Sequence, residues 1–289
     1  MSWVSIDREK CDDCGLCATR CLLCFSNKDG EITVNADEAT CSLCGHCVSL
    51  CPTGAIHHTR MNMDNFLPVD RTVKFDTDAF VHFIRMRRSH RHFKDRGIPR
   101  SHLETLVDTC RYAPTGGNRQ TVEIKIIQDP GKMKRFSDHT VDYFMSLYKK
   151  IEEQVAELEA AGKELPKDLR SMQANFSRYK YLGLARDFGL DVIFYKAPAV
   201  MLFHSPTHST TPKDDCVIAA QTVTLLAMTM GLGTCYIGLF TVASNAHPPI
   251  AEELRLPPNH KVFSALIMGY PKLKYLRSVD RKPAKVTWE

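Results

Sequence analysis

Eight of the twelve cysteines fall into two copies of one spacing, CxxCxxCxxxC, between residues 11 and 51. The first copy comprises Cys11, Cys14, Cys17 and Cys21, and the second comprises Cys41, Cys44, Cys47 and Cys51. This thiolate run wraps cubic iron-sulfur clusters, because three cysteines in a tight loop bind one cube while the fourth reaches the other cube. The spacing therefore predicts two 4Fe-4S clusters, with Cys51 completing the first set and Cys21 the second.

Two other readings of these cysteines stay open, a structural zinc site and a disulfide framework. Zinc usually takes two separated CxxC pairs, and a disulfide framework is typical of a short secreted chain. Gly15 and Gly45 occupy matching positions in the two copies, where the backbone must curl around a cluster. These observations favour iron-sulfur clusters over zinc and over disulfides.

Residues 1–60 resemble a bacterial two-cluster ferredoxin, with a close match in the run Cys51-Pro52-Thr53-Gly54-Ala55-Ile56. One departure concerns Cys21, which is followed by Leu22 where that family has proline. Cys24 lies just beyond as a spare thiol, and we interpret it as a small buried apolar residue.

The length of 289 residues leaves room for a second, larger domain. We expect a ferredoxin-like domain at 1–60, a linker at 61–77 and a flavin-binding domain at 78–289. The formal net charge of +5, with 25% charged and 44% hydrophobic residues, is too mildly basic to indicate nucleic-acid binding. The sequence therefore predicts two domains and no nucleic-acid partner.

The N-terminus lacks the basic and apolar regions of an export signal. The longest apolar stretch, 216–233, is interrupted by Gln221 and by threonines, which suits a buried helix better than a membrane span. Many thiols without an export signal indicate a reducing compartment. We therefore expect a cytoplasmic protein that makes no membrane contact.

Periodicity after residue 77 predicts an α+β sandwich, because helices and strands intermix without a regular βαβ repeat. A capping box at Ser101 and Glu104 predicts a helix start there, and Asp129-Pro130-Gly131 predicts a turn. The predicted helices are 78–93, 101–113, 140–161, 166–188 and 214–230. The predicted strands are 122–127, 199–203, 234–240 and 262–268.

An electron-carrying domain fused to a larger one implies an acceptor, and a flavin can couple single electrons to hydride chemistry. Neither GxxxxGK[ST] nor GxGxxG is present, so side chains would have to hold a flavin phosphate. Guanidinium forks and a hydroxyl could do so at Arg87, Arg88, Ser89 and Arg91. A solvated basic patch at a helix end is the alternative for these residues.

Four motifs resemble the FMN-dependent nitroreductase family in order and spacing, over roughly residues 80–289. They are the runs at 87–93 (RRSHRHF), 113–120 (APTGGNRQ), 231–238 (GLGTCYIG) and 269–271 (GYP). Together with the first domain, the chain resembles the ferredoxin-fused nitroreductases. The loop after Asn118 departs from many relatives, since no Pro-Trp follows Gln120.

The resemblance implies a role for each matching residue. Arg87, Ser89 and Arg91, with Arg88 alongside, would hold the FMN phosphate and ribityl chain. A homodimer is implied, in which Pro114, Thr115, Gly116 and Asn118 would touch the flavin held mainly by the partner. Ile237 and Gly238 would line the flavin ring and offer a backbone amide. Arg281 and Lys282 would close on the phosphate, with a solvated tail as the alternative.

The implied activity passes electrons from the clusters to FMN and on to a nitroaromatic, a quinone or an activated alkene. Reduced ferredoxin or NAD(P)H would be the donor. Other flavin chemistry, such as dehalogenation or a biosynthetic oxidation, is an alternative, as is a non-catalytic electron carrier or redox sensor. No catalytic proton donor stands out among His204, His208 and His247. Substrate choice would reside in the helical insertion at 139–188.

Overall fold

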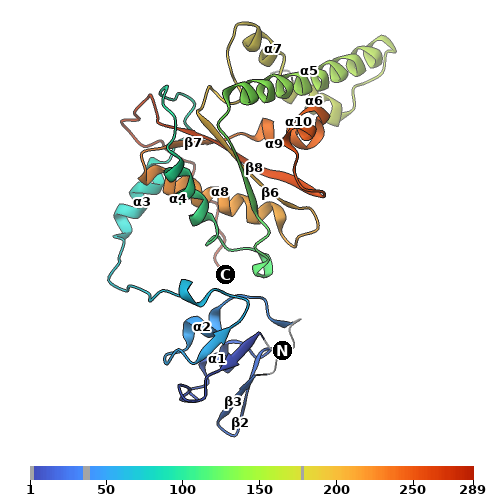
Figure 1. The fold of residues 1–289 in the computed structure, drawn as a ribbon. Coiled ribbons are helices and arrows are strands. Elements are labelled where there is room, and N and C mark those ends of the chain that lie inside the picture. The colour runs from blue at the N-terminus through green and yellow to red at the C-terminus, as the bar shows by residue number, and fades with distance from the viewer. Residues whose placement is uncertain (1–2, 35–39, 177–178) are drawn as a thin grey trace. The chain divides into compact units, whose positions relative to one another are not determined.

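The computed structural model describes residues 3–34, 40–176 and 179–289, and the chain divides into two units (Figure 1). The first unit is Met1–Asp76 with Gly117–Arg119. The second unit is Thr77–Gly116 with Gln120–Glu289.

The first unit repeats a strand–helix–strand pattern twice. Its elements in chain order are β1 (Val4–Ile6), α1 (Leu16–Arg20), β2 (Phe25–Lys28), β3 (Glu31–Val34), α2 (His46–Leu50) and β4 (Ile56–His58). β1 pairs antiparallel with β4, and β2 pairs antiparallel with β3. Gly15 and Gly45 precede the two helices with φ angles of 74° and 70°, in the left-handed region that glycine adopts without steric cost.

The core of this unit is small. Its buried members are Val4, Ala18, Cys24, Phe25, Ile32 and Ile56. Half-buried thiols complete the packing around them, among them Cys17, Cys21, Cys47 and Cys51. The cysteines are therefore part of the packed interior as well as candidate ligands.

Residues 61–76 form an exposed connector in which a single 3-10 turn, η2 (Met63–Asn65), is the regular structure described. The Asn62 side chain accepts a hydrogen bond from the Asp64 amide and so begins that turn. We keep a 1–60 domain, a 61–77 linker and a 78–289 domain as a proposal.

A four-stranded antiparallel sheet organises the second unit. Its order is β5 (Glu123–Ile127), β6 (Ala199–Pro206), β8 (His260–Gly269) and β7 (Gly233–Tyr236). Both faces of β6 are buried, because Ala199, Met201 and Phe203 pack on one side while Val200 and Leu202 pack on the other. This explains why β6 is an almost continuous apolar run.

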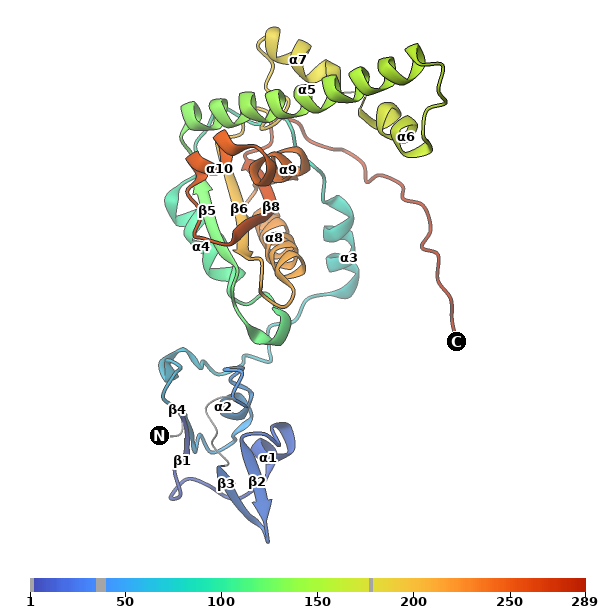
Figure 2. The ribbon, with the colours of Figure 1, turned by 90° about the vertical axis from the view of Figure 1, so that its right-hand side faces the viewer.

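Helices cover both faces of the sheet. α4 (Arg100–Cys110) and α8 (Pro212–Thr229) pack against one face. α5 (Pro130–Ala160), the long green helix at the top of Figure 2, packs with α9 (Gly238–Ala246) and α10 (Pro248–Leu254) against the other. The prediction of an α+β sandwich is confirmed.

Several predicted boundaries are wrong. The helix expected over 78–93 is α3 (Thr77–Met86), and residues 87–94 are not helical. The capping box is absent, because Ser101 lies inside α4, which begins after Pro99 without a side-chain cap. The strand expected over 234–240 ends at Tyr236, where α9 follows.

The helical insertion also differs from expectation. The predicted turn at 129–131 is the start of α5, where the Asp129 side chain accepts from the Lys132 amide and Pro130 occupies the first helical position. The segment expected as one helix over 166–188 contains α6 (Lys167–Phe176) and α7 (Lys180–Asp187). Of the helices described, none combines the length and apolar character that a bilayer crossing requires.

Candidate functional site

Cys41, Cys44 and Cys47 of the second cysteine copy lie close to one another and to Cys21. The pKa of Cys47 is raised to about 11, mainly by burial and also by negative charge on Cys44, Cys41 and Cys21. A cavity of about 490 Å³ in the first unit is lined by these four residues together with Cys24. The fold therefore brings Cys21, from the first copy, to the second set.

The other three cysteines of the first copy, Cys11, Cys14 and Cys17, lie near one another. Burial raises the pKa of Cys17, and the charges of Cys11 and Cys14 add to the increase. Cys51 differs, because burial alone would raise its pKa but hydrogen bonds from Thr53 and the Ala55 amide lower it overall. The Ala55 nitrogen lies 3.2 Å from the Cys51 sulfur, and such amide donors stabilise cluster thiolates.

Cys24 is the spare thiol next to Cys21. It is buried, and burial is the main reason that its pKa rises to about 12, with Cys21 and Cys41 contributing. A thiol with so high a pKa is neutral at pH 7 and suits the apolar core. All twelve cysteines are free, so no disulfide framework forms.

This donor set fits iron-sulfur clusters. Thiolates are the ligands such clusters require, and each helix after a cysteine loop begins at a left-handed glycine. His58, which is buried, places its Nε2 3.5 Å from the Cys41 sulfur and adds a second polar contact to the ligand set.

The basic segment 87–94 lies extended against the open edge of β7. Ser89 pairs with Thr234 as a parallel bridge, and the His90 amide donates to the Thr234 carbonyl at 3.0 Å. Further along, the Lys94 amide donates to the Tyr270 carbonyl at 2.8 Å. These long-range bonds replace the helix that local periodicity predicts for this segment.

Two glycines make this close approach possible. Gly233 on β7 pairs with Gly269 on β8. A Cβ atom on Gly233 would lie 2.6 Å from the His90 ring, and one on Gly269 would lie 2.6 Å from Pro198 and 2.8 Å from Phe93. Any larger residue at these positions would push segment 87–94 off the sheet edge.

The segment carries an unsatisfied cation. The Nε of Arg88 is buried and has no hydrogen-bond partner among residues 3–34, 40–176 and 179–289. The Arg88 guanidinium lies 5.6 Å from the Tyr275 ring centre, and the His90 ring contacts the same tyrosine at 5.3 Å. Burial, and then the charges of Arg87 and Arg88, lower the pKa of His90. An anion bound here would satisfy the donor and offset the positive charge.

Arg91 faces a different neighbour. Its guanidinium lies 5.7 Å from the ring centre of Tyr195. Burial raises the pKa of Tyr195, and the Arg91 charge opposes that rise. Two of the residues predicted to bind the FMN phosphate therefore have different neighbours, because Arg88 is beside Tyr275 whereas Arg91 is beside Tyr195.

The predicted flavin-contact loop is held by a buried carboxylate that the sequence analysis missed. The Gly116 amide donates to Asp215 Oδ1 at 3.0 Å, and the Thr211 hydroxyl donates to the same oxygen at 2.8 Å. A Cβ atom on Gly116 would lie 2.1 Å from the Thr211 hydroxyl. Asp215 is an acidic residue in the first turn of α8, directly before the apolar run that begins at Cys216, which is the signal that could have identified it.

The other loop residues are placed differently. Thr115 accepts the Gln120 amide through its hydroxyl at 3.0 Å, and Pro114 is exposed. Asn118 is grouped with the first unit, whereas residues 114–116 belong to the second. The motif at 113–120 is therefore divided, with Gly117, Asn118 and Arg119 in the first unit and its other residues in the second.

One backbone amide near β8 is available to a ligand. The Ile237 amide donates to the Ala265 carbonyl at 2.9 Å and is thus already used. Gly238 is the first residue of α9, where a helical N–H has no intrahelical acceptor. Gly238 is also exposed, and no atom lies within 4 Å of where its Cβ would be. Of the two predicted residues, Gly238 can donate and Ile237 cannot.

These arrangements accompany a match to a known family. The family model described as Nitroreductase family matches residues 84–270. The chain belongs to the nitroreductase family. A second family model, described as 4Fe-4S binding domain, matches residues 34–57. The predicted combination of an N-terminal 4Fe-4S domain with a nitroreductase domain is confirmed, and membership identifies an oxidoreductase of the nitroreductase type.

Individual relatives agree with this assignment. A 4-nitrobenzoate reductase of Nocardioides sp. (strain LMS-CY) is 26% identical over 204 residues, which are 67% of this chain and 81% of that protein. Crystal structures of nitroreductases with bound FMN from Bacteroides fragilis NCTC 9343 and Desulfitobacterium hafniense DCB-2 are each 20% identical and each cover 72% of this chain. They are covered to 96% and 97%, both with a TM-score of 0.52, and at this identity they establish the fold.

Arg281 and Lys282 are not brought to the basic segment. Both are exposed in the C-terminal tail, which leaves the sheet and ends apart from it in Figure 2. The Arg281 amide donates to the adjacent Asp280 side chain. This placement agrees with the alternative given above, in which Arg281 and Lys282 belong to a solvated tail.

The three candidate histidines do not converge on one site. His204 is buried on β6 beside His260, and burial is the main cause that lowers its pKa. His247 packs against the rings of His139 and Tyr143, and His208 is exposed after β6. No proton donor is assigned from this set.

A cavity of about 720 Å³ lies elsewhere in the second unit, between residues 93–97, the start of α5 and residues 186–198. Asp191 in its lining accepts from the Ser137 hydroxyl at 2.8 Å and from the amides of Ile193, Phe194 and Lys196. Both oxygens of the Asp191 carboxylate thus accept hydrogen bonds from within the protein. None of the predicted phosphate contacts lines this cavity, so it is not assigned to the flavin.

Proposed function

We propose that this nitroreductase uses FMN and two 4Fe-4S clusters to deliver electrons to a nitroaromatic, a quinone or an activated alkene. The observation that carries the proposal is the buried Arg88 Nε without a partner, flanked by Arg87 and His90 on a nitroreductase fold. A buried charged donor costs free energy unless an acceptor satisfies it, and a phosphate would do so.

The chain offers FMN both charged side chains and a backbone donor. Arg87, Arg88 and Ser89 bind the phosphate, and the Gly238 amide donates to the ring system. The other residues proposed to touch FMN or the partner's FMN are Arg91, Pro114, Thr115, Gly116, Asn118 and Ile237, with Arg281 and Lys282 joining if the tail folds back. Bound FMN supplies two-electron storage and hydride transfer. The FMN in the two related crystal structures supports this assignment.

The eight cysteines hold the two clusters in crossed sets. One set is Cys11, Cys14, Cys17 and Cys51, and the other is Cys41, Cys44, Cys47 and Cys21. The effect of Cys44, Cys41 and Cys21 on the pKa of Cys47 supports the second set, because these residues must lie near Cys47 to exert it. Bound clusters supply one-electron transfer. Cys17 and Cys47 are half-buried, which limits the access of solvent to their sulfurs.

A homodimer is the proposed assembly. α3 has no buried residue, yet it carries Val81 and Ile84 on one face of its surface. Apolar side chains at helical spacing that remain exposed indicate a partner surface. A second copy of the chain would cover them and would bring its own flavin-contact loop to the shared site.

The donor and the acceptor are proposed by chemistry. Reduced ferredoxin or NAD(P)H supplies electrons, and a nitroaromatic acid is the first acceptor to test because a relative is a 4-nitrobenzoate reductase. The cytoplasm is the proposed location, since twelve free thiols require reducing surroundings.

The test replaces the arginine that carries the proposal. We expect Arg88→Gln to weaken FMN binding about 10- to 100-fold, because a hydrogen bond to a charged group is worth about 1.5–3 kcal/mol. Quenching of flavin fluorescence measures the affinity. Arg100→Gln is the matched control, since Arg100 is an exposed arginine that pairs with Glu104 on α4. Equal affinity in both variants would refute the phosphate role of Arg88.

The same preparations test the activity. Wild-type protein, loaded with iron and FMN and reduced without oxygen, is mixed with 4-nitrobenzoate. We expect the flavin absorbance to return faster than in buffer, and more slowly in Arg88→Gln at an FMN concentration that leaves this variant partly unloaded. Return at the buffer rate with each acceptor class would reject the proposed function, and return only with a carrier protein would favour an electron carrier.

A further inference from the structure

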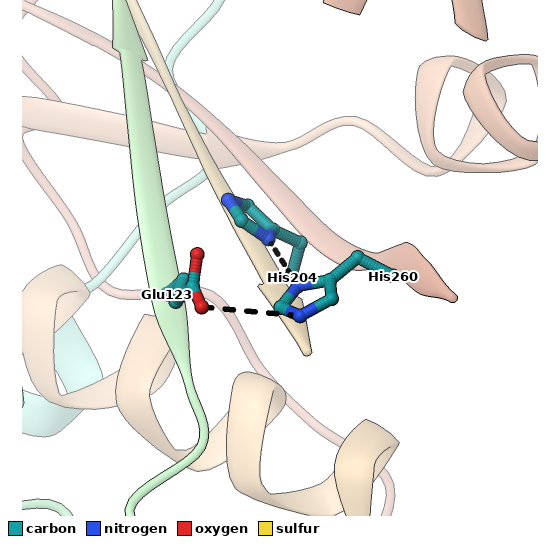
Figure 3. A group of neighbouring side chains, drawn as sticks. All are labelled: Glu123, His204 and His260. Atoms are coloured by element: carbon teal, nitrogen blue, oxygen red, sulfur yellow. Dashed lines mark hydrogen bonds and ion pairs between the residues drawn. The ribbon is translucent and has the colours of Figure 1, made fainter. Parts of the chain in front are cut away.

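Three side chains of metal-ligating type meet at one end of the sheet of the second unit. Glu123 is on β5, His204 on β6 and His260 at the start of β8 (Figure 3). Each residue offers one ligand atom, and these atoms all lie within 4.8 Å of one another. The cluster plays no part in the proposed flavin or iron-sulfur chemistry.

The strand register places these side chains on the same face. Glu123 pairs directly with His204 across β5 and β6. His204 follows Val200 and Leu202 at intervals of two, on the face covered by α5, α9 and α10. The β-bulge between Phe203 and His204 shifts the pairing so that His204 faces Val262 and Pro206 faces His260. Bulges of this kind re-aim a side chain next to a site.

The distances suit a shared ion. His204 Nδ1 and His260 Nδ1 are 2.9 Å apart, and His260 Nε2 is 3.8 Å from Glu123 Oε1. Two ligand atoms that each lie about 2.0–2.1 Å from a tetrahedral zinc are about 3.3 Å from each other. The first separation uses His260 Nδ1 and the second uses His260 Nε2, and one ion takes only one of these nitrogens. One ligand atom from each residue lies within 4.8 Å of the others, so side-chain rotations that draw these three atoms together would complete the site.

We propose that Glu123, His204 and His260 bind one divalent transition-metal ion of the zinc class. Two imidazoles and one carboxylate form a three-residue zinc set that leaves a fourth position for water. His204 is 4% exposed whereas the Glu123 side chain is 55% exposed, so the ion would be reached from the glutamate side.

The chemistry of the neighbourhood selects the metal. Calcium and magnesium require mainly oxygen ligands, and this cluster has two nitrogen donors and one carboxylate. Lys125 lies two residues along β5 on the same face, so the surroundings are not strongly anionic. Binding would therefore depend on the imidazole nitrogens, which favour zinc, copper or nickel over the hard cations.

An ion here would tie three strands together where the chain enters the sheet. β5 begins just after the predicted flavin-contact loop, whose Gly116 is held by Asp215. Joining Glu123 to β6 and β8 would fix the start of β5. The proposed role is thus structural, and it does not depend on the proposed acceptor.

The experiment measures zinc in the full chain with its iron in place. Protein purified without oxygen is incubated with zinc, desalted and analysed for zinc and iron by mass spectrometry. We expect about one zinc per chain in the wild type, lost in His260→Gln and in Glu123→Gln, with iron unchanged. His208→Gln is the matched control, because His208 is an exposed histidine outside the cluster, and we expect it to keep its zinc.

Unequal folding does not obscure the outcome. Glu123 is mostly exposed, so its variant preserves the fold even if the histidine variant does not, and thermal melting checks both. Zinc bound by cysteines would be present in the wild type and in every variant, so it does not contribute to the difference in zinc content between them. Zinc content that is the same in wild type, Glu123→Gln and His260→Gln would overturn the proposal. An anomalous diffraction peak at the zinc edge between the three residues would support it directly.

Discussion

The two units use different means to reach a folded state. The second unit buries large apolar side chains on both faces of its sheet, including Phe136, Phe203 and Phe240. The first unit has six buried core residues, one of which is a cysteine, and surrounds them with half-buried thiols. A domain of about 60 residues with so small a core usually needs disulfides or metal for stability. The fold of the first unit therefore depends on its ligands, whereas the second depends on its core.

The largest expected effect removes a ligand from the first unit. Cys47→Ala should lose about half of the iron, because each of the two proposed cubic clusters would hold half of the total, and should make residues 1–76 sensitive to protease. Cluster binding and folding are coupled in a unit with few apolar contacts. Iron analysis and limited proteolysis measure both results. The melting temperature of the second unit should not change.

Cys24→Ala is the control for this substitution, since Cys24 is a buried thiol of the same cavity that is not proposed as a ligand. It should keep all of the iron. Loss of iron from Cys24→Ala would show that Cys24 replaces Cys21 in the second set. An intact, protease-resistant first unit in Cys47→Ala would contradict the difference drawn between the units.

The reciprocal change affects the second unit. Phe203→Ala should lower its free energy of unfolding by about 3–5 kcal/mol, because Phe203 is fully buried between the sheet and α4 and α8. Chemical denaturation followed by circular dichroism measures the loss. Iron content should stay at the wild-type value. Val107→Ala on the exposed side of α4 is the control and should change the free energy little.

The smallest expected effect concerns acidity at the basic segment. Burial and the nearby arginines hold the pKa of His90 below its ordinary value of about 6.5. The unfolded chain then binds a proton more readily than the folded chain, so stability should fall as the pH falls through about 6.5. Denaturation of flavin-free protein between pH 8 and pH 5.5 measures this. His90→Gln should give a flatter pH dependence, and an unchanged slope would exclude His90 as a cause.

The spacing of the cysteines in the first unit predicted which of them lie together, whereas local pattern predicted several element boundaries of the second unit wrongly. Each cysteine loop is contiguous, so spacing alone identified the residues that the fold gathers. Residues 87–93 were predicted as the continuation of a helix that begins near Asp78. The bonds of segment 87–94 to Thr234 and Tyr270 come from residues far along the chain. The start of α9 was missed for a related reason, since the apolar run continues from β7 through Gly238.

The metal-ligating cluster and the carboxylate that holds Gly116 could not be predicted from spacing. Glu123, His204 and His260 are widely separated in sequence and meet only because β5, β6 and β8 are adjacent. Asp215 is identifiable as unusual, but its partners Gly116 and Thr211 become evident only in the folded chain. Strand order and register supply this information, and neither is encoded by local periodicity.

The paired glycines on β7 and β8 restrict how this protein can be altered. Neighbouring side chains pack directly on the main chain at these two glycines and leave no room for a Cβ atom. Mutant libraries aimed at new acceptors should therefore leave both codons unchanged and vary the exposed loops instead. Laboratory evolution would otherwise discard most of its clones at Gly233 and Gly269 before any change in selectivity could be seen.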